Sequence, residues 1–299
     1  MKFSYYLNSL ILIFFIISCQ ENPGSFATSS NINLCDNKMS LKSIIGYIDW
    51  IEYNQTGDYA QNSNELAVAQ IKIPSMLASC TGFLINEDTI MTNNHCISSP
   101  SKSPNVEAIF RSENGDRTSF VCDQFITTNF QYDFTLIKCN NSPGKEFGWV
   151  GLSHLKPEID SQIYLVQENC DYISDPHCVI DKFVAFGKIL GSQQTRIYHN
   201  ADTLAGSSGS PIFSEESHQV IAIHNAGSIT SDENSAKNGG VPMYKIRNLI
   251  ETTTDVIIHE FGTAGEFPIG QIETLPENEP HEDINDSTGD SNMNDNCSL

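Results

Sequence analysis

Residues 206–209 read Gly-Ser-Ser-Gly and lie within the stretch from Asp202 to Phe213, which ends in a short apolar run. Glycine tolerates tight turns, so a turn here can lift one serine hydroxyl out of the backbone. A hydroxyl attacks a carbonyl carbon when a base removes its proton and nearby donors hold the oxyanion that forms. The stretch therefore predicts a nucleophilic serine. Taken alone, such a stretch is more often a serine-rich loop between strands.

Two other stretches provide the partners that such a serine needs. His95 follows an apolar run and precedes Cys96, and Asp133 stands directly before the apolar run 134–137. A histidine is the usual base for a serine, and a carboxylate can orient its ring. Taken singly, each has a structural explanation, since core histidines and aspartates at turns are common. In the order His95, Asp133, Ser208 they predict acyl-transfer chemistry.

The sequences around these residues resemble those of the chymotrypsin superfamily of serine peptidases. The resemblance spans about residues 44–255 and rests on four pieces: Cys-Thr-Gly-Phe-Leu-Ile, Thr-Asn-Asn-His-Cys, Asp-Phe-Thr-Leu-Ile and Gly-Ser-Ser-Gly-Ser-Pro-Ile-Phe. The last piece, with the Ile-His-Asn-Ala-Gly that follows at 223–227, is similar to the bacterial glutamyl endopeptidases and their trypsin-like relatives. The resemblance implies two antiparallel six-stranded β-barrels with the active site in the cleft between them.

The resemblance also implies a role for each residue. Ser208 would attack the scissile carbonyl, and His95 would act first as base and then as acid to the leaving amine. Asp133 would fix the imidazole tautomer. The backbone N–H groups of Gly206 and Ser208 would form the oxyanion hole. This chemistry requires no metal or other cofactor.

Two neighbouring serines compete for the role of nucleophile. Ser207 and Ser210 flank the position that the family pattern Gly-x-Ser-Gly assigns to Ser208. The trypsin branch carries an Asp immediately before its nucleophile, which pairs with an amine freed on activation, whereas this chain has Ser207 there. Residues 44–46, Ile-Ile-Gly, resemble such a freed terminus but lack this partner. We therefore interpret residues 44–51 as a first strand and expect no activation of that kind.

The signals for substrate specificity conflict. Thr203 and His224 occupy the positions where glutamyl endopeptidases bind an acidic side chain, whereas Asp202 lies where trypsin-like enzymes keep the acid that selects Arg or Lys. A buried carboxylate would repel a substrate carboxylate, so both signals cannot dominate. We favour acidic substrates slightly; the alternative for His224 is a plain core histidine. Gly227 and Gly240 are expected to open the pocket walls.

The middle of the chain predicts an all-β protein with one short C-terminal helix, because short β-branched and aromatic runs alternate with turn formers. The expected strands are 81–85, 89–92, 106–110, 134–137, 162–166, 179–189 and 220–224. Met243, Ile246, Leu249 and Ile250 fall on one helical face after Pro242. We place the peptidase domain at residues 44–262, with the first barrel at about 44–150 and the second at about 151–262.

Nine cysteines in one chain favour disulfides and hence export. Cys80 and Cys96 flank two strand-like runs, and their spacing is similar to that of the disulfide at the histidine loop of the trypsin-like branch. We expect this pair most firmly. The other expected pairs are Cys122 with Cys139, Cys170 with Cys178 and, by elimination, Cys35 with Cys297.

Both ends of the chain predict segments outside the barrels. Residues 1–19 resemble a secretory signal whose Ile-Ile-Ser-Cys end is similar to a bacterial lipoprotein box, so Cys19 is a candidate for lipidation; ordinary secretion is the alternative. Residues 20–43 suit a flexible tether. Residues 263–299 form an acidic tail, with eight acidic residues and no Lys or Arg after Gly270.

These observations together predict a secreted or membrane-tethered serine endopeptidase of the bacterial cell envelope, acting on proteins or peptides as a monomer with a slight preference for cleavage after Glu. The net charge of −21 argues against a nucleic-acid partner. The alternative is a catalytically silent surface lipoprotein that uses the same double barrel to bind a protein or peptide.

Overall fold

A computed structural model describes most of the chain between residues 43 and 263. The described residues are 43–45, 48–53, 55, 57–74, 79–170, 177, 179–227 and 237–263. All of them belong to one compact unit, Asn37–Leu299. The predicted signal, Cys19, the tether before residue 43 and the acidic tail after Thr263 lie outside the described residues, so these assignments stay predictions.

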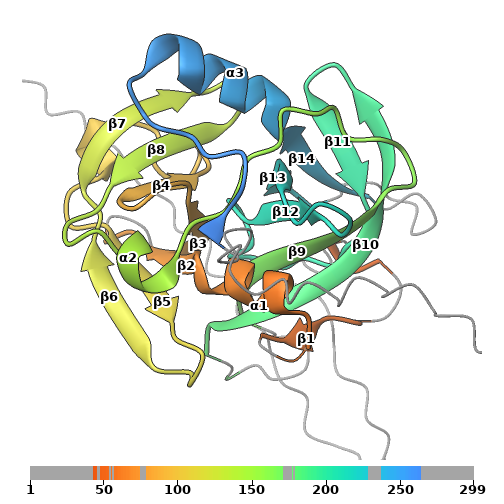
Figure 1. Cartoon of the computed structure of the whole chain (residues 1–299), viewed down its shortest axis with the longest axis horizontal. Coiled ribbons are helices and arrows are strands. Elements are labelled where there is room, and N and C mark those ends of the chain that lie inside the picture. Colours follow the sequence, from red (N-terminus) through yellow and green to blue (C-terminus); the bar gives the residue numbers. More distant parts are fainter. Residues whose placement is uncertain are drawn as a thin grey trace, which may run out of the picture. The chain divides into compact units, whose positions relative to one another are not determined.

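The first half of the chain forms an open, curled antiparallel sheet of seven strands in the order β6-β5-β2-β3-β4-β8-β7 (Figure 1). Its strands are β2 (Val68–Lys72), β3 (Ser79–Leu84), β4 (Thr89–Thr92), β5 (Glu107–Arg111), β6 (Arg117–Val121), β7 (Gln124–Asn129) and β8 (Phe134–Lys138). Where the sheet curls, Asn140 N–H donates to Val121 O at 2.9 Å, which joins the end of β6 to the residues after β8.

The second half forms a closed barrel of six antiparallel strands. Its strands are β9 (Gln162–Asn169), β10 (Asp181–Gln193), β11 (Arg196–His199), β12 (Pro211–Ser214), β13 (Val220–Ala226) and β14 (Asn238–Pro242). The ring closes because β9 pairs with both β12 and β10. A two-residue strand, β1 (Ile51–Glu52), pairs with the outer side of β10.

In the described part of the chain, the strands are accompanied by three α-helices and a 3-10 helix. They are α1 (Tyr59–Leu66), α2 (Gly144–Phe147), α3 (Met243–Thr253) and the 3-10 turn at Pro100–Lys102. Asp58 caps α1 by accepting a hydrogen bond from Gln61 N–H at 2.8 Å, which satisfies a backbone donor at the helix start. The predicted C-terminal helix is α3, which begins after Pro242.

A buried ionic cluster links the two sheets. Arg111 of β5 lies 3.6 Å from the Glu168 carboxylate of β9 and 3.0 Å from that of Asp181. Lys182 of β10 is fully buried, and its Nζ donates to the main-chain oxygens of Glu65 at 2.7 Å and Val68 at 2.8 Å. Burial raises the pKa of Glu168 and lowers that of Lys182 to about 8. These contacts tie β5 and the start of β2 to the closed barrel.

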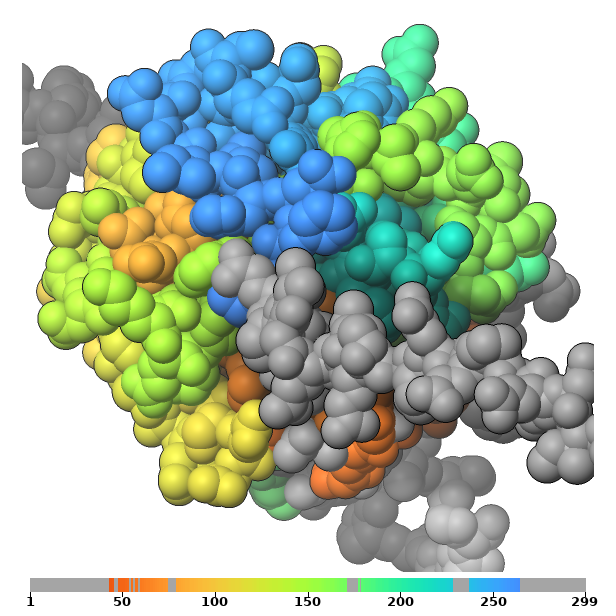
Figure 2. Space-filling view, in the orientation of Figure 1, coloured from red at the N-terminus to blue at the C-terminus, as the bar shows by residue number. Residues whose placement is uncertain are grey.

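The residues after α3 run back over both halves of the fold. Asn86 of the β3–β4 turn donates to Ile257 O at 3.0 Å, and Gln219 before β13 donates to Glu260 O at 2.8 Å. Figure 2 shows this dark-blue segment lying between the orange and yellow first half and the green second half. The C-terminal segment therefore holds the two sheets together on this face.

The fold class is confirmed, with two differences in detail. The structure is a chymotrypsin-like double barrel, but in the described residues the first sheet is an open half-barrel rather than a closed six-stranded barrel. The reading of residues 44–51 as a first strand is wrong in extent, since among the described residues of that segment (44, 45 and 48–51) only Ile51 is in a strand, and it pairs with the second barrel. The backbone of residues 43–45 instead bonds to the loop before the Gly-Ser-Ser-Gly turn, as Thr203 N–H donating to Ser43 O at 3.2 Å shows.

Two of the expected disulfides are confirmed. Cys80 pairs with Cys96, and Cys122 pairs with Cys139. Cys170 is disulfide-bonded as well. Cys35, Cys178 and Cys297 lie outside the described residues, so the other two pairings remain predictions. Within the described part of the chain, no helix is long and apolar enough to cross a membrane.

Replacing the fully buried Ile246 of α3 tests how the helix is held. Ile246 belongs to the main hydrophobic core, so Ile246→Ala is expected to lower the free energy of unfolding by about 2–5 kcal/mol. Asn248→Ala on the exposed face of the same helix should change it by less than about 0.5 kcal/mol. Denaturant unfolding measures both, and equal losses in the two variants would contradict this packing.

Candidate active site

The turn between β7 and β8 brings an acid to a histidine. Asp133 adopts φ +44°, a left-handed conformation that Asp tolerates better than most residues. Its Oδ2 lies 2.9 Å from His95 Nδ1, and its Oδ1 accepts a hydrogen bond from His95 N–H at 3.0 Å. The carboxylate thus fixes both the backbone and the ring of His95. The His95 side chain is 45% exposed, and the carboxylate contacts only one of its two ring nitrogens.

A third group from the other barrel contacts the same carboxylate. Asn225 of β13 donates through Nδ2 to Asp133 Oδ2 at 3.2 Å. Asn225 also lines a pocket together with Ser208, so the pocket that contains Ser208 adjoins the His95–Asp133 pair. The sequence analysis missed Asn225, because its only signal was its place next to His224.

The Gly-Ser-Ser-Gly turn is seated against the first sheet. Thr81 of β3 donates its N–H to Ser208 O at 2.8 Å and its hydroxyl to Gly206 O at 2.9 Å. Gly206 has φ +107° and Gly209 has φ +89°, conformations that favour glycine. A Cβ at Gly209 would lie 2.1 Å from Thr81 O, so a side chain has no space there.

Two of the backbone N–H groups in the Gly-Ser-Ser-Gly turn donate hydrogen bonds to described residues of the protein, and two do not. Ser207 N–H donates to Leu204 O at 3.1 Å, and Gly209 N–H donates to His224 O at 3.0 Å. The N–H groups of Gly206 and Ser208 make no hydrogen bond with any described residue. These two are the donors that the sequence analysis predicted for an oxyanion hole.

The pocket beside Ser208 has a volume of about 360 Å³. Its lining residues are Ser43, Thr203, Leu204, Ala205, Ser208, His224, Asn225, Ala226 and Gly227. Of the residues predicted to contact substrate, Thr203, His224 and Gly227 therefore line it. A Cβ at Gly227 would lie 2.0 Å from Ser43 Oγ, so the glycine makes room for the N-terminal segment.

Two other predicted residues lie away from this pocket. Asp202 is 1% exposed and is not among the lining residues; its Oδ1 accepts a hydrogen bond from Ile45 N–H at 2.7 Å. Burial and the nearby Asp49 carboxylate raise the pKa of Asp202 to about 6. Gly240 does not open a pocket wall as expected, because a Cβ there would meet Ile212 at 2.8 Å and Ile223 O at 2.9 Å.

His224 is supported by a second histidine that the sequence analysis overlooked. His199 of β11 is fully buried, and its Nε2 lies 3.3 Å from His224 Nδ1. Burial lowers the pKa of His199 to about 3, and burial together with His199 lowers that of His224 well below its usual value. Both rings are therefore neutral at pH 7, and His224 presents its remaining nitrogen as a hydrogen-bonding group.

Comparison with known proteins supports the family resemblance that the sequence motifs predicted. The family model of the trypsin-like peptidase domain matches residues 80–223. The chain carries a trypsin-like peptidase domain.

The curated relatives of this peptidase domain are distant. The chain is 26% identical over 204 residues to secreted RxLR effector protein 73 of Plasmopara viticola, across 61% of this chain and 48% of that protein. It is 25% identical over 206 residues to a glutamyl endopeptidase of Bacillus licheniformis, across 63% of this chain and 62% of that protein. The chain thus spans between about half and just under two thirds of the length of these relatives.

Solved structures confirm the fold of the peptidase domain. A Glu endopeptidase in complex with MPD aligns with a TM-score of 0.54 and 21% identity, over 70% of this chain and 99% of that chain. Neuropsin, a serine protease of mouse brain, aligns with a TM-score of 0.51 and 17% identity, over 64% of this chain and 95% of that chain. At these identities the likeness concerns the fold alone.

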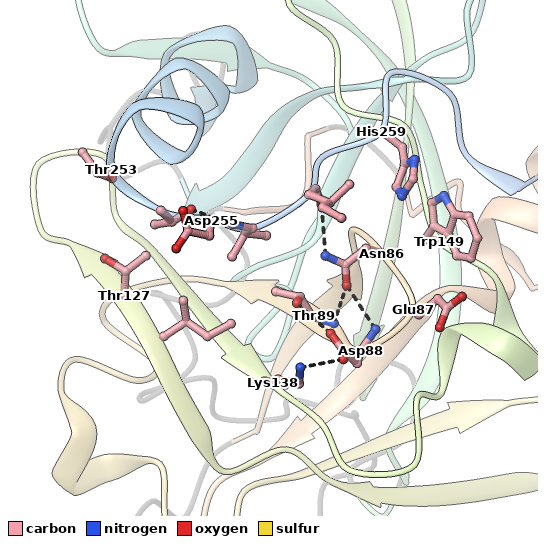
Figure 3. Close-up of a pocket in the computed structure, with 14 residues that line it drawn as sticks. Asn86, Glu87, Asp88, Thr89, Thr127, Lys138, Trp149, Thr253, Asp255 and His259 are labelled. Carbon is pink, nitrogen blue, oxygen red and sulfur yellow. Dashed lines mark hydrogen bonds and ion pairs between the residues drawn. The ribbon is translucent and has the colours of Figure 1, made fainter.

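A larger groove, of about 800 Å³, lies elsewhere on the peptidase domain (Figure 3). It runs between the β3–β4 turn, β7 and the residues after α3, and none of His95, Asp133 and Ser208 lines it. Lys138 points to the Asp88 carboxylate, 2.9 Å away, and the Trp149 and His259 rings stack with centroids 5.0 Å apart.

The raised pKa of Asp202 predicts a pH dependence of stability. A carboxyl group with a folded pKa of about 6 and an unfolded pKa of about 3.9 binds its proton more tightly in the folded state. Its contribution to stability is therefore full below about pH 4 and is lost as the pH rises through about 6. The free energy of unfolding of the wild type, minus that of Asp202→Asn, should increase as the pH falls from 7 to 4. Denaturant titrations at several pH values measure it, and parallel curves would contradict the raised pKa.

Proposed function

We propose that this protein is a serine endopeptidase that uses Ser208, His95 and Asp133. The hydrogen bonds from His95 and Asn225 to one Asp133 carboxylate, beside the pocket that Ser208 lines, are the observation that carries this proposal. The trypsin-like peptidase domain provides the fold in which such a triad acts.

In the proposed reaction each group has one role. The Ser208 hydroxyl oxygen bonds to the scissile carbonyl carbon while its proton passes to His95 Nε2. The carbonyl oxygen becomes an oxyanion held by the N–H groups of Gly206 and Ser208. The amide C–N bond then breaks, and His95 gives the proton to the leaving amine. Water then attacks the acyl carbon while its proton passes to His95 Nε2, the ester C–O bond breaks, and His95 returns the proton to Ser208 Oγ.

We further propose a preference for Glu at the residue before the cleaved bond. When His199 Nε2 donates to His224 Nδ1, the second nitrogen of His224 carries a hydrogen and can donate to a substrate carboxylate in the pocket. Thr203 lines the same pocket. Asp202, the competing signal, is buried against Ile45 N–H outside the lining residues. A similarity to a glutamyl endopeptidase supports this choice.

Export fits the same function. Two disulfides in the peptidase domain are typical of proteins from oxidising compartments, and one relative is a secreted effector. Attachment to a membrane through Cys19 is the finer part of this proposal. Mass spectrometry of the mature protein would detect the lipid on this residue.

A fluorophosphonate probe tests the nucleophile, because it reacts with an activated serine. We expect labelling of the wild type on the peptide that contains Ser208 and complete loss in Ser208→Ala. Asp133→Asn should reduce the rate of peptide cleavage about 10⁴-fold, since the imidazole would be held in the wrong tautomer. A folded, mature wild type that takes up no label would contradict the proposal and favour a binding module.

Paired peptides that differ only in Glu or Gln test the specificity. The wild type should cleave after Glu in preference to Gln, and His224→Gln should lower kcat/KM for the Glu peptide at least about 10-fold while probe labelling persists, since one hydrogen bond to a charged group is worth about 1.5–3 kcal/mol. His154→Gln, at a half-exposed histidine outside the pocket, is the matched control and should leave the preference intact. Preferred cleavage after Arg or Lys would show that the assignment of the pocket is wrong.

A further inference from the structure

Ser207, the residue immediately before Ser208, has a fully buried side chain whose hydroxyl makes three hydrogen bonds. Ser207 Oγ donates to Gln167 Oε1 at 2.5 Å. It accepts hydrogen bonds from Asn169 Nδ2 at 3.2 Å and from Leu204 N–H at 3.2 Å. Ser207, Gln167 and Asn169 are each 0% exposed, so water does not compete for these bonds.

Gln167 also holds the other end of the turn. Its Nε2 donates to Asp202 O at 3.0 Å, so one side chain contacts both the start of the loop and Ser207. Gln167 and Asn169 project from the end of β9, where the strand pairs with β10, Gln167 opposite Phe183 and Asn169 opposite Asp181. The two side chains therefore stand on a rigid part of the closed barrel.

The same strand end fits closely against Gly206. A Cβ at Gly206 would lie 2.8 Å from Glu168 O and 3.5 Å from the Asn169 side chain. Ser207 links the peptide units of Gly206 and Ser208, whose N–H groups have no described partner. The angle between these two N–H groups depends on the backbone torsions of Gly206 and Ser207, so a rotation at Ser207 would turn one N–H away from the other.

We propose that Gln167 and Asn169 are positioning residues for the oxyanion hole. They act through the Ser207 hydroxyl, which they hold so that the N–H groups of Gly206 and Ser208 point to the same place before substrate arrives. Such preorganisation matters because donors that are already oriented need not reorganise during the reaction. The inference rests on the proposed peptidase function and adds to it two residues that do not touch the substrate.

We call the hydrogen-bonded side chains of Ser207, Gln167 and Asn169 the clamp. It contains no ionisable side chain. Ser207 occupies the position where the trypsin branch carries an Asp that pairs with a freed amine, and here amide and hydroxyl groups perform the holding. Loss of the clamp should therefore reduce the rate by the same factor at every pH. If the clamp instead relied on a charged side chain, the factor by which its loss lowers the rate would change with pH as that side chain ionises.

Two variants of similar shape remove the clamp bonds. Ser207→Ala deletes the hydroxyl, and Gln167→Met replaces the amide with an apolar side chain of similar length. Because loss of one oxyanion donor costs about 100–1,000-fold, misorientation of the donors is expected to lower kcat by about 10–100-fold with little change in KM. The double variant should lose little more than the worse single variant, since both remove the same hydrogen bond.

Ser210→Ala is the matched control. Ser210 is also 0% exposed and lies two residues beyond Ser208, but its hydroxyl has no hydrogen-bond partner among the described residues. The same loss of one buried oxygen there should leave kcat unchanged. Thermal unfolding of all variants reports whether each is folded at the assay temperature.

A peptide aldehyde separates positioning from general damage. Its adduct with Ser208 carries an oxyanion, so its affinity should fall by the same factor as kcat/KM in Ser207→Ala and Gln167→Met, while the affinity for the product peptide stays constant. Equal losses for aldehyde and product peptide, or unchanged aldehyde affinity in folded variants, would overturn the proposal. Wild-type labelling by the fluorophosphonate at Ser208 is recorded in the same series, so failure of the peptidase function itself is recognised separately.

Discussion

One residue of the first sheet, Thr81, fixes where the serine turn lies. Its N–H donates to Ser208 O, and its hydroxyl donates to Gly206 O while accepting from Glu168 N–H of β9 at 3.0 Å. The turn thus belongs by sequence to the second barrel and is held partly by the first. Because His95 and Asp133 come from that first sheet, this contact gives the two halves of the site a common reference. Movement between the sheets would break it.

Buried charged side chains lie where the two sheets meet, and they restrict how the sheets can dock against each other. Glu168, Arg111 and Lys182 are buried, and each finds partners in the opposite half of the fold or next to it. Removing one partner from such a cluster leaves an uncompensated buried charge, which costs more than an apolar substitution would. The cluster therefore disfavours any docking of the sheets that leaves a charge unpaired. Glu168 of this cluster lies at the end of β9, between Gln167 and Asn169, the two residues that bind the Ser207 hydroxyl.

Much of the fold and of the candidate site could be predicted from the sequence, because these features have local sequence patterns. Alternating runs identified β4, β8 and β13, the periodic apolar face identified α3, and short motifs identified the residues of the candidate site. The missed elements lack such patterns. Helix α1 is polar and docks through Asn64, which donates to Tyr164 Oη at 3.0 Å, and β14 is glycine-rich because Gly240 packs directly on Ile223 O. Gln167, His199 and Asn225 were also missed, since only tertiary contacts bring them to the site.

The central claim is that Ser208 attacks a carbonyl whose oxygen then meets the N–H groups of Gly206 and Ser208. A crystal structure of the protein inactivated by a peptidyl phosphonate measures this directly, because the phosphonyl oxygen occupies the position of the oxyanion. The account predicts a covalent bond to Ser208 Oγ, with that oxygen at about 2.7–3.1 Å from both nitrogens and His95 Nε2 beside Oγ. Attachment to another residue, or a phosphonyl oxygen directed away from the turn, would contradict it.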